Sequence, residues 1–244
     1  MGLKKFVMKY KFDLIENIDI DKESSWKGKI FLTFDVDWAS EEVWLHTIKI
    51  LELYDVPATW FVTHKSPLIS RILKNPKFSV GIHPNFNPLI NSFSNSKVAN
   101  QIIDDFDKFL PRSKLLRSHS LFQSERLLDV FNSRGYEFIC NSFIPINENQ
   151  LIVPYRLWDN IKIVPHCWQD NVSLKMNLKF PNELDKDQLI VLDFHPIHVF
   201  LNSENLDRYE NSREFHSDYI KLKEMVNNGY GIKSILINLI QDNL

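Results

Sequence analysis

Short apolar runs alternate with amphipathic stretches along most of the chain. The apolar runs have the length of strands, and the amphipathic stretches repeat apolar residues at helical spacing. The predicted strands cover residues 29–34, 58–62, 78–83, 115–116, 136–143 and 189–194. The predicted helices cover residues 40–56, 98–109, 124–134, 213–228 and 232–240, and a further helix opens at Ser66-Pro67.

Local signals set several of the predicted boundaries. Ser40 is a good N-cap, and two glutamates follow it in the first turn, where negative charge is favourable. Pro111 ends the helix over 98–109, and Gly135 closes the helix over 124–134. Residues 147–187 show neither period, so the pattern predicts an irregular segment there.

Repeated alternation of strand and helix predicts a parallel sheet with helices outside it. The chain has 244 residues, which suits one domain of barrel size or two small ones. No fixed-period repeat and no low-complexity linker divides it. We therefore expect an α/β fold in a single domain.

Composition and the N-terminal residues limit the expected partners and the expected cellular location. Lys and Arg number 29 and Asp and Glu 31, so the formal charge of −2 calls for neither nucleic acid nor an anionic membrane as partner. Two cysteines make no disulfide framework. The N-terminal residues lack the apolar core of a signal peptide, and no stretch approaches a membrane span in length. These features predict a cytoplasmic protein without a membrane span.

Polar residues that could take part in catalysis or metal binding follow the predicted strands. The carboxyl ends of parallel strands meet at one face of a sheet or barrel, and sites form there. We therefore expect these side chains to share one site. They are Asp35 and Asp37, His83, Arg117 and His119, and His195.

The two aspartates suit hydrolysis at a metal. One carboxylate can hold a cation while the other takes a proton from water. The alternative is a helix cap and a solvated loop residue, but Asp35 directly follows an apolar strand, where an idle carboxylate is costly to bury. His83, braced by Pro84, is a candidate ligand, or else a histidine satisfied by backbone groups.

Three later motifs add candidates with weaker signals. Arg117 can orient a carboxylate through its planar fork, or it is a surface charge. His195 can give a proton to a leaving group, whereas a satisfied core histidine is the better interpretation of His198. Trp168 can form an apolar wall and Asp170 can pair with Arg117, or both anchor a loop.

Together the motifs TFDVD, GIHPN, LRSHS and LDFHP, in this order, resemble the polysaccharide deacetylase family, the NodB-homology group or carbohydrate esterase family 4. The resemblance spans residues 30–240 and is closest to a divergent branch associated with surface-polysaccharide gene clusters. It implies a deformed (β/α) barrel of about seven strand-helix units. In this interpretation residues 29–244 form the barrel domain and residues 1–28 an extension packed on it.

The resemblance also implies roles. Asp35 corresponds to the catalytic base, Asp37 and His83 to metal ligands, and Arg117 to the residue that steadies the base. Asn87 stands where the family has a second histidine ligand. Either Asn87 binds a harder metal, another histidine replaces it, or the metal is lost; we favour replacement by His119. The remaining implied roles are the general acid for His195, catalytic support for Asp170, and substrate contacts for Trp38, Asn87 and Trp168.

The expected function is therefore a divalent-metal-dependent hydrolase, with zinc as the expected ion. It would remove an acyl group, expected to be N-acetyl, from a carbohydrate or sugar nucleotide in polysaccharide biosynthesis or modification. Three alternatives remain: a catalytically inactive carbohydrate-binding relative, a hydrolase of a non-sugar amide, and a metal-dependent phosphoesterase. The sequence predicts no oligomeric state.

Overall fold

The computed structural model describes residues 9–91, 95–110, 112–146, 150–158 and 160–244. Pro111, which was expected to end a helix, and residues 147–149 of the segment expected to be irregular lie outside the described residues.

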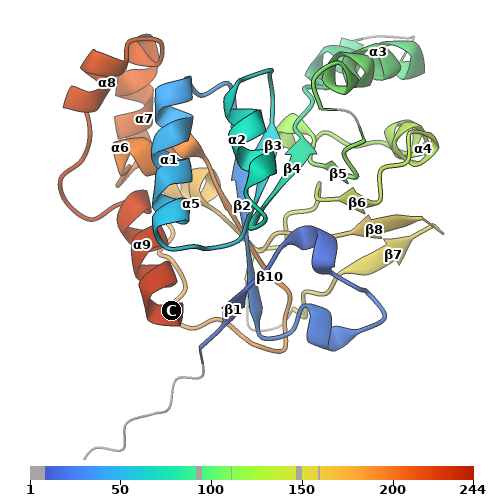
Figure 1. The fold of residues 1–244 in the computed structure, drawn as a ribbon, viewed down its shortest axis with the longest axis horizontal. Helices are drawn as coiled ribbons and strands as arrows, with labels where there is room; N and C mark the ends of the chain where they lie inside the picture. Colours follow the sequence, from blue (N-terminus) through green and yellow to red (C-terminus); the bar gives the residue numbers. More distant parts are fainter. Residues whose placement is uncertain (1–8, 92–94, 111, 147–149, 159) are drawn as a thin grey trace, which may run out of the picture.

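One curled sheet carries the fold (Figure 1). In the described part of the chain it has ten strands in the order β7-β8-β6-β5-β4-β3-β2-β10-β9, with β1 beside β2. All pairs are parallel except β7 with β8. The strands are β1 (Lys11–Phe12), β2 (Lys29–Asp35), β3 (Ala58–Val62), β4 (Phe78–Ile82), β5 (Leu115–Leu116), β6 (Phe138–Ile139), β7 (Tyr155–Leu157), β8 (Ile161–Ile163), β9 (Trp168–Gln169) and β10 (Ile190–Phe194).

Helices surround this sheet (Figure 1). They are α1 (Glu41–Leu53), α2 (Leu68–Lys74), α3 (Asn95–Asp107), α4 (Glu125–Ser133), α5 (Asp170–Met176), α6 (Pro196–Leu201), α7 (Leu206–Ser212), α8 (Tyr219–Glu224) and α9 (Ile232–Asn243). Short 3₁₀ turns lie at η1 (Ile15–Asn17), η2 (Glu23–Ser25), η3 (Asn87–Asn91), η4 (His119–Leu121) and η5 (Arg213–Phe215). The predicted α/β fold is confirmed: it is a deformed, open (β/α) barrel in which β7 and β9 are the two ends of the strand order.

The central strands are buried on both faces. Every residue of β3, β4 and β10 is buried, as expected for barrel strands with helices on the outer face and packed side chains on the inner face. Aromatic rings fill the space between layers: Phe34 stacks on Trp60 at 4.7 Å and on Phe194 at 5.7 Å between ring centroids. This packing lies directly beneath the ends of β2, β3 and β10, and the candidate site lies on strand ends of this sheet.

The N-terminal residues join this body. β1 pairs in parallel with β2, and Ile15 and Ile18 are buried in the main core. Tyr10 donates from its backbone N–H to Asn243 at 2.8 Å and from its hydroxyl to the carbonyl of Leu184. Residues 9–28 therefore pack against β2, the first strand of the barrel domain, and against segments in its C-terminal part.

Most predicted elements before residue 135 have the expected type. Ser40 caps α1, accepting from the backbone N–H of Val43, and Ser124 caps α4 in the same way. The strand expected at 136–143 is only Phe138–Ile139, because the side chain of Asn141 accepts from the backbone N–H of Ser118 instead of extending the ladder.

The helices and strands after residue 135 were predicted less well than those before it. Residues 147–187 are not irregular throughout: they contain β7, β8, β9 and α5, of which the strands have two or three residues and no readable period. The helix expected at 213–228 is a 3₁₀ turn followed by α8. Helix α6 was missed because all six of its residues are buried, so it carries no amphipathic pattern.

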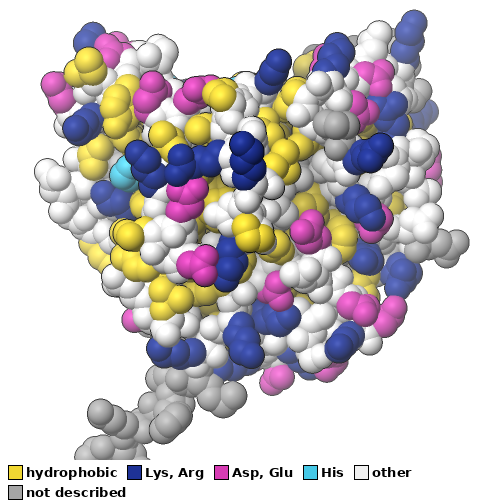
Figure 2. Space-filling model, viewed as in Figure 1, with side chains coloured by type: hydrophobic (Ala, Val, Ile, Leu, Met, Phe, Trp, Pro, Cys, Tyr) yellow, Lys and Arg dark blue, Asp and Glu magenta, His cyan; other side chains and the backbone are white. Residues whose placement is uncertain are grey.

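Two features concern possible partners: the charges on the surface and the length of the helices. On the face that Figure 2 shows, basic and acidic side chains are interspersed. Among the described residues, no helix is both long enough and apolar enough to span a bilayer.

Candidate active site

The ends of neighbouring strands bring the candidate side chains together. Asp35 is the last residue of β2, His83 follows β4, Arg117 follows β5 and His195 follows β10. These strands are close neighbours in the order β5-β4-β3-β2-β10. After β2 the backbone turns through two consecutive left-handed residues, Asp37 (φ 44°) and Trp38 (φ 57°). The turn returns Asp37 to the same site as Asp35.

Arg117 is the centre of a buried charge cluster. Its side chain is 0% exposed, and one guanidinium nitrogen, Nη1, donates to Asp35 Oδ1 at 2.9 Å, to Thr33 Oγ1 at 3.0 Å and to Asp193. Nε donates to the carbonyl of Cys140 at 3.2 Å, and the guanidinium lies 4.5 Å from the ring centroid of Phe61. Burial by itself would lower the pKa of Arg117, but the charges of Asp193 and Asp35 raise it above its ordinary value. The guanidinium is therefore a permanent, fixed cation behind Asp35.

Asp193 was not predicted as a site residue. It is 0% exposed and lies in β10 opposite Thr33 of β2. Burial raises its pKa, with the charge of Asp35 acting in the same direction and that of Arg117 against it. The available signal was a carboxylate inside the otherwise apolar run LIVLDF, since a charge is costly to bury without a partner.

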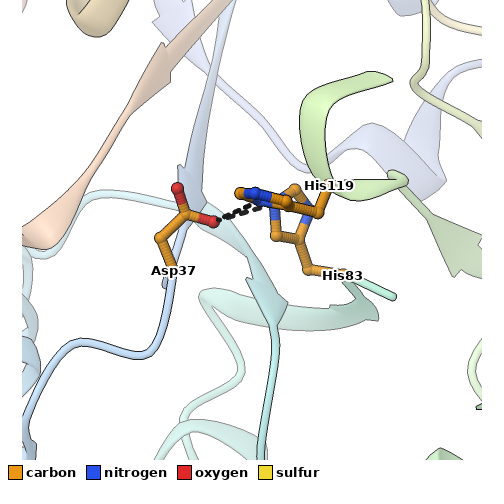
Figure 3. Close-up of side chains that lie close together, drawn as sticks. All are labelled: Asp37, His83 and His119. Atoms are coloured by element: carbon orange, nitrogen blue, oxygen red, sulfur yellow. Dashed lines mark hydrogen bonds and ion pairs between the residues drawn. The ribbon is translucent and has the colours of Figure 1, made fainter. Parts of the chain in front are cut away.

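Asp37, His83 and His119 form a compact cluster of possible metal ligands (Figure 3). One ligand atom from each lies within 4.8 Å of the others. Asp37 Oδ1 is 3.1 Å from His83 Nε2 and 3.0 Å from His119 Nδ1. Burial would raise the pKa of Asp37, but hydrogen bonds from His119 and His83 hold it well below its ordinary value.

The chemistry of these donors fits a divalent ion. The carbonyl of Arg117 can only accept, so the 2.7 Å contact with His83 Nδ1 places the proton on that nitrogen. In the neutral form that binds a metal, the ring would carry its lone pair on Nε2, which faces Asp37, and this is how metal-binding histidines are usually oriented. Two imidazoles and one carboxylate are also a familiar ligand set for catalytic zinc.

Asn87 contacts the loop that carries His119. It begins η3, and its side-chain amide donates to Ser120 Oγ at 3.4 Å. His119 instead begins η4, where its backbone N–H donates to the carbonyl of Pro84 at 2.9 Å. That bond ties the loop after β5 to the loop after β4. The structure thus places His119 beside Asp37 and His83.

A second group of possible ligands does not suit a metal. Asp35, Asp193 and His195 also have ligand atoms within 4.8 Å of one another. Arg117 donates to both of these carboxylates. Because its fixed positive charge already lies in this group, a second cation there would be repelled.

His195 and Asp170 form a buried pair. His195 Nδ1 lies 2.6 Å from Asp170 Oδ1, and the backbone N–H of His195 donates to Asp170 Oδ2 at 2.7 Å. Burial would lower the pKa of His195, but the charge and hydrogen bond of Asp170 raise it well above its ordinary value. The other ring nitrogen, Nε2, lies 3.4 Å from Asp37 Oδ2. The expected pairing of Asp170 with Arg117 is wrong, because both carboxylate oxygens of Asp170 serve His195.

The two tryptophans differ in their placement. Trp168 is 5% exposed, and its ring packs on Phe180 and Phe194. It therefore belongs to the core, which corrects the expectation that it forms a substrate wall. Trp38 is 51% exposed and lies edge-on to the ring of His119 at 5.0 Å. Trp38 therefore lies at the mouth of the site, and the substrate contact expected of it stays a prediction.

The family of WbmS-like polysaccharide deacetylases matches residues 32–213, a range that contains all four motifs. The chain belongs to this family. The resemblance inferred from the motifs is thereby confirmed.

Among solved structures, WbmS from Bordetella bronchiseptica is 39% identical, with a TM-score of 0.89, and the match covers 96% of this chain and 98% of that one. WbmS is described as a polysaccharide deacetylase involved in O-antigen biosynthesis. A protein of Mycobacterium smegmatis assigned as a polysaccharide deacetylase matches at 12% identity over 96% of each chain, with a TM-score of 0.48. None of the curated proteins matches this chain.

Proposed function

We propose that this member of the WbmS-like family is a metal-dependent hydrolase. It removes an N-acetyl group from a carbohydrate during the synthesis or modification of a surface polysaccharide. One observation carries the proposal: side chains from three strand ends and the turn after β2 converge, each within 4 Å of another. His83 Nε2 lies 3.6 Å from Asp35 Oδ2 and 3.1 Å from Asp37, and Asp37 lies 3.4 Å from His195. The identity to WbmS supports the polysaccharide context.

Asp37, His83 and His119 would hold the divalent ion, for which zinc is the best match to two imidazoles and a carboxylate. Such an ion, when bound, polarises the scissile carbonyl and lowers the pKa of water. His83 is held for this purpose by its hydrogen bond to the carbonyl of Arg117. A ligand fixed from behind keeps its lone pair aimed without further loss of conformational freedom.

Asp35 would act as the base. Its Oδ1 is taken by Arg117, so Oδ2, which lies 3.6 Å from His83 Nε2, is the oxygen that faces the cluster. Arg117 keeps the carboxylate aimed because the guanidinium is itself held by Thr33, Asp193 and the carbonyl of Cys140. Asp35 Oδ2 can therefore take the proton of the attacking water.

His195 would act as the acid. Nδ1 is held by Asp170, so the proton for the departing amine comes from Nε2, on the side of Asp37. A raised pKa keeps the ring protonated at neutral pH, which is the form an acid needs. The pair thus holds the imidazole in one orientation and favours its protonated form.

The test is release of acetate from N-acetylated sugars by the purified protein, before and after metal removal by a chelator. Asp35→Asn should abolish turnover and leave metal content unchanged, because Asp35 is assigned no ligand role. Asp129→Asn is the matched control, since Asp129 is exposed on α4 away from the strand ends. Turnover by Asp35→Asn at the wild-type rate, or full activity without metal, would show that the proposal is wrong. Binding of sugars without any hydrolysis would favour the inactive carbohydrate-binding alternative.

A further inference from the structure

The segment of residues 117–119 carries several of the contacts that hold the proposed site together. The Arg117 guanidinium donates to the proposed base, and the carbonyl of the same residue accepts from His83 Nδ1 at 2.7 Å. The ring of His119 lies 3.0 Å from Asp37 Oδ1 (Figure 3). A small rotation of this segment would therefore misplace the base and two of the three proposed ligands together.

The main chain of the sheet supports this segment from one side. β5, which precedes the segment, has only two residues and a single register pair with β4. The backbone N–H groups of the first and last residues of the segment donate at 3.1 Å and 2.9 Å to carbonyls at the end of β4, those of Ile82 and Pro84. Successive N–H groups of an extended chain point to opposite sides, so the N–H of Ser118 points toward β6. Within the described chain no backbone carbonyl accepts it, so its orientation depends on a side chain.

Asn141 takes the place of a strand partner on that side. It lies two residues after β6 and is 6% exposed, and Ser118 is 0% exposed. The side-chain oxygen of Asn141 accepts from the Ser118 N–H at 2.7 Å, and the side-chain nitrogen donates to Ser118 Oγ at 3.0 Å. A backbone N–H can only donate, so the atom that faces it is the amide oxygen. Two bonds to one buried residue fix both its backbone and its side chain.

The bond to Asn141 acts on the same peptide group that orients His83. The peptide between Arg117 and Ser118 is trans, so its N–H and its carbonyl point in opposite directions. The N–H is held by Asn141 and the carbonyl accepts from His83 Nδ1, so hydrogen bonds run in series from Asn141 to the His83 ring. Bonds in such a series polarise one another. Asn141 thus fixes the direction of the carbonyl on which the orientation of His83 Nε2 depends.

Other contacts between β5 and β6 do not hold this peptide. The Cys140 N–H donates to the carbonyl of Leu116 at 2.9 Å, and Arg117 Nε donates to the carbonyl of Cys140 at 3.2 Å. The first of these bonds fixes the end of β5, and the second fixes the guanidinium. Neither reaches the N–H of Ser118, which would be buried without a partner if the Asn141 side chain were removed.

We propose that Asn141 is a positioning residue of the metal site and acts through the peptide between Arg117 and Ser118. The inference rests on the proposed function for the ligand set. It goes beyond that function because it assigns control of metal affinity to a residue after β6, whose side chain bonds Ser118 alone within the described chain. Removing that side chain should loosen His83 through the Arg117 carbonyl, and should loosen His119 because Ser118 is its neighbour.

The experiment measures zinc affinity by competition with a chromogenic chelator. It also records the visible spectrum of cobalt(II) bound in place of zinc, which depends on ligand geometry. Asn141→Ala removes both bonds, so it should lower zinc affinity about tenfold and change the cobalt spectrum, as expected when a group that orients a ligand is lost. Asn141→Ser is polar but too short for both bonds, so it should show the same loss and repeats the test if the alanine variant does not fold. Ser118→Ala keeps the N–H bond and should lower affinity less.

The matched control is a buried asparagine that supports the fold away from the site. Asn202 is 2% exposed, and its side-chain amide donates to the carbonyls of Asn227 and Gly229. It ends α6, whose other end is at His195, and glycine tolerates its left-handed backbone, with φ 49°. Asn202→Gly should therefore lower the urea midpoint of unfolding, as Asn141→Ala does, but leave zinc affinity and the cobalt spectrum unchanged.

Wild-type zinc affinity and an unchanged cobalt spectrum in Asn141→Ala would overturn the inference, and the ligand set would stand if His119→Ala still lost affinity. An equal loss in Asn202→Gly would overturn the inference as well, because affinity would then follow fold stability. A loss in Ser118→Ala as large as that in Asn141→Ala would overturn the route through the peptide N–H. Lower affinity in Asn141→Ala without any acetate release by the wild-type protein would overturn the hydrolase and leave the inference. A wild-type protein that binds no zinc would overturn the proposed ligand set and the inference with it.

Discussion

Replacing Arg117 by Met tests the buried charge cluster most directly. The substitution keeps much of the side-chain volume but removes the cation that Asp35 and Asp193 share. Those two carboxylates are 2% and 0% exposed, so water cannot replace the lost partner. Removing one member of a buried ion pair costs about 3–5 kcal/mol. Because whole domains are stable by only about 5–15 kcal/mol, this loss should be large and easily measured.

A double variant shows whether the loss comes from the stranded charge. Arg117→Met combined with Asp193→Leu removes the cation and one of its carboxylates together, and apolar replacements of buried ion pairs are often close to neutral. The double variant should therefore regain at least half of the stability lost by Arg117→Met. It should not regain activity, because Asp35 still lacks the guanidinium that holds its Oδ1.

The free energy of unfolding should be measured by urea denaturation across pH. A buried carboxylate whose folded-state pKa is raised binds more protons when folded, so stability falls as pH rises between the unfolded and folded pKa values. Asp193 already has its pKa raised to about 7, and loss of Arg117 removes the one charge that lowers it most. The window therefore runs from about pH 4 upward through 7, and Arg117→Met should be closest to wild type at its acid end.

The control for this series is Arg134→Met. Arg134 pairs with Asp104 and Asp107 on the surface, where an ion pair contributes less than about 1 kcal/mol. The reasoning fails if Arg117→Met is as stable as Arg134→Met at neutral pH. It also fails if the double variant is no more stable than Arg117→Met.

Three further predictions concern individual parts of the site. His119→Ala should lower zinc affinity at least tenfold and Asn87→Ala should leave it unchanged, as measured by competition with a chromogenic chelator; equal effects would remove His119 from the ligand set. Asp170→Asn should lower kcat for an N-acetyl sugar about 100-fold but have little effect on p-nitrophenyl acetate, whose leaving group needs no proton; an equal loss on both substrates would contradict His195 as the acid. Gly81→Ala should destabilise the protein by about 1–3 kcal/mol in urea denaturation and lower kcat. The reason is that a Cβ there would lie 2.6 Å from the ring of Phe61, over which the guanidinium of Arg117 lies. Wild-type stability and activity would show that Phe61 can move aside freely.

The sequence by itself determined the parts of the fold that depend on local patterns. Apolar runs of strand length and capped amphipathic stretches depend only on neighbouring residues, so β2, β3, β4, β10, α1 and α4 were all predicted with the correct type. The alternation of these elements implied a parallel sheet, and a parallel sheet gathers its strand ends on one face. That reasoning was enough to nominate Asp35, Asp37, His83 and His195 as one site.

Short or fully buried elements escaped this reasoning. Strands of two or three residues, such as those between 155 and 169, are too short to display a period. Helix α6 is buried on every side, so it lacks the separate polar and apolar faces by which a surface helix is recognised. Their form depends on neighbours from distant parts of the chain.

Only the tertiary structure decided which charged groups meet. It paired Asp170 with His195 rather than with Arg117, placed His119 beside Asp37, and added Asp193 to the cluster behind Asp35. These contacts join residues that are 25 to 82 positions apart. Hydrogen bonds and ion pairs act only over a few ångströms, so they depend on strand order and loop geometry, which local patterns along the chain do not specify.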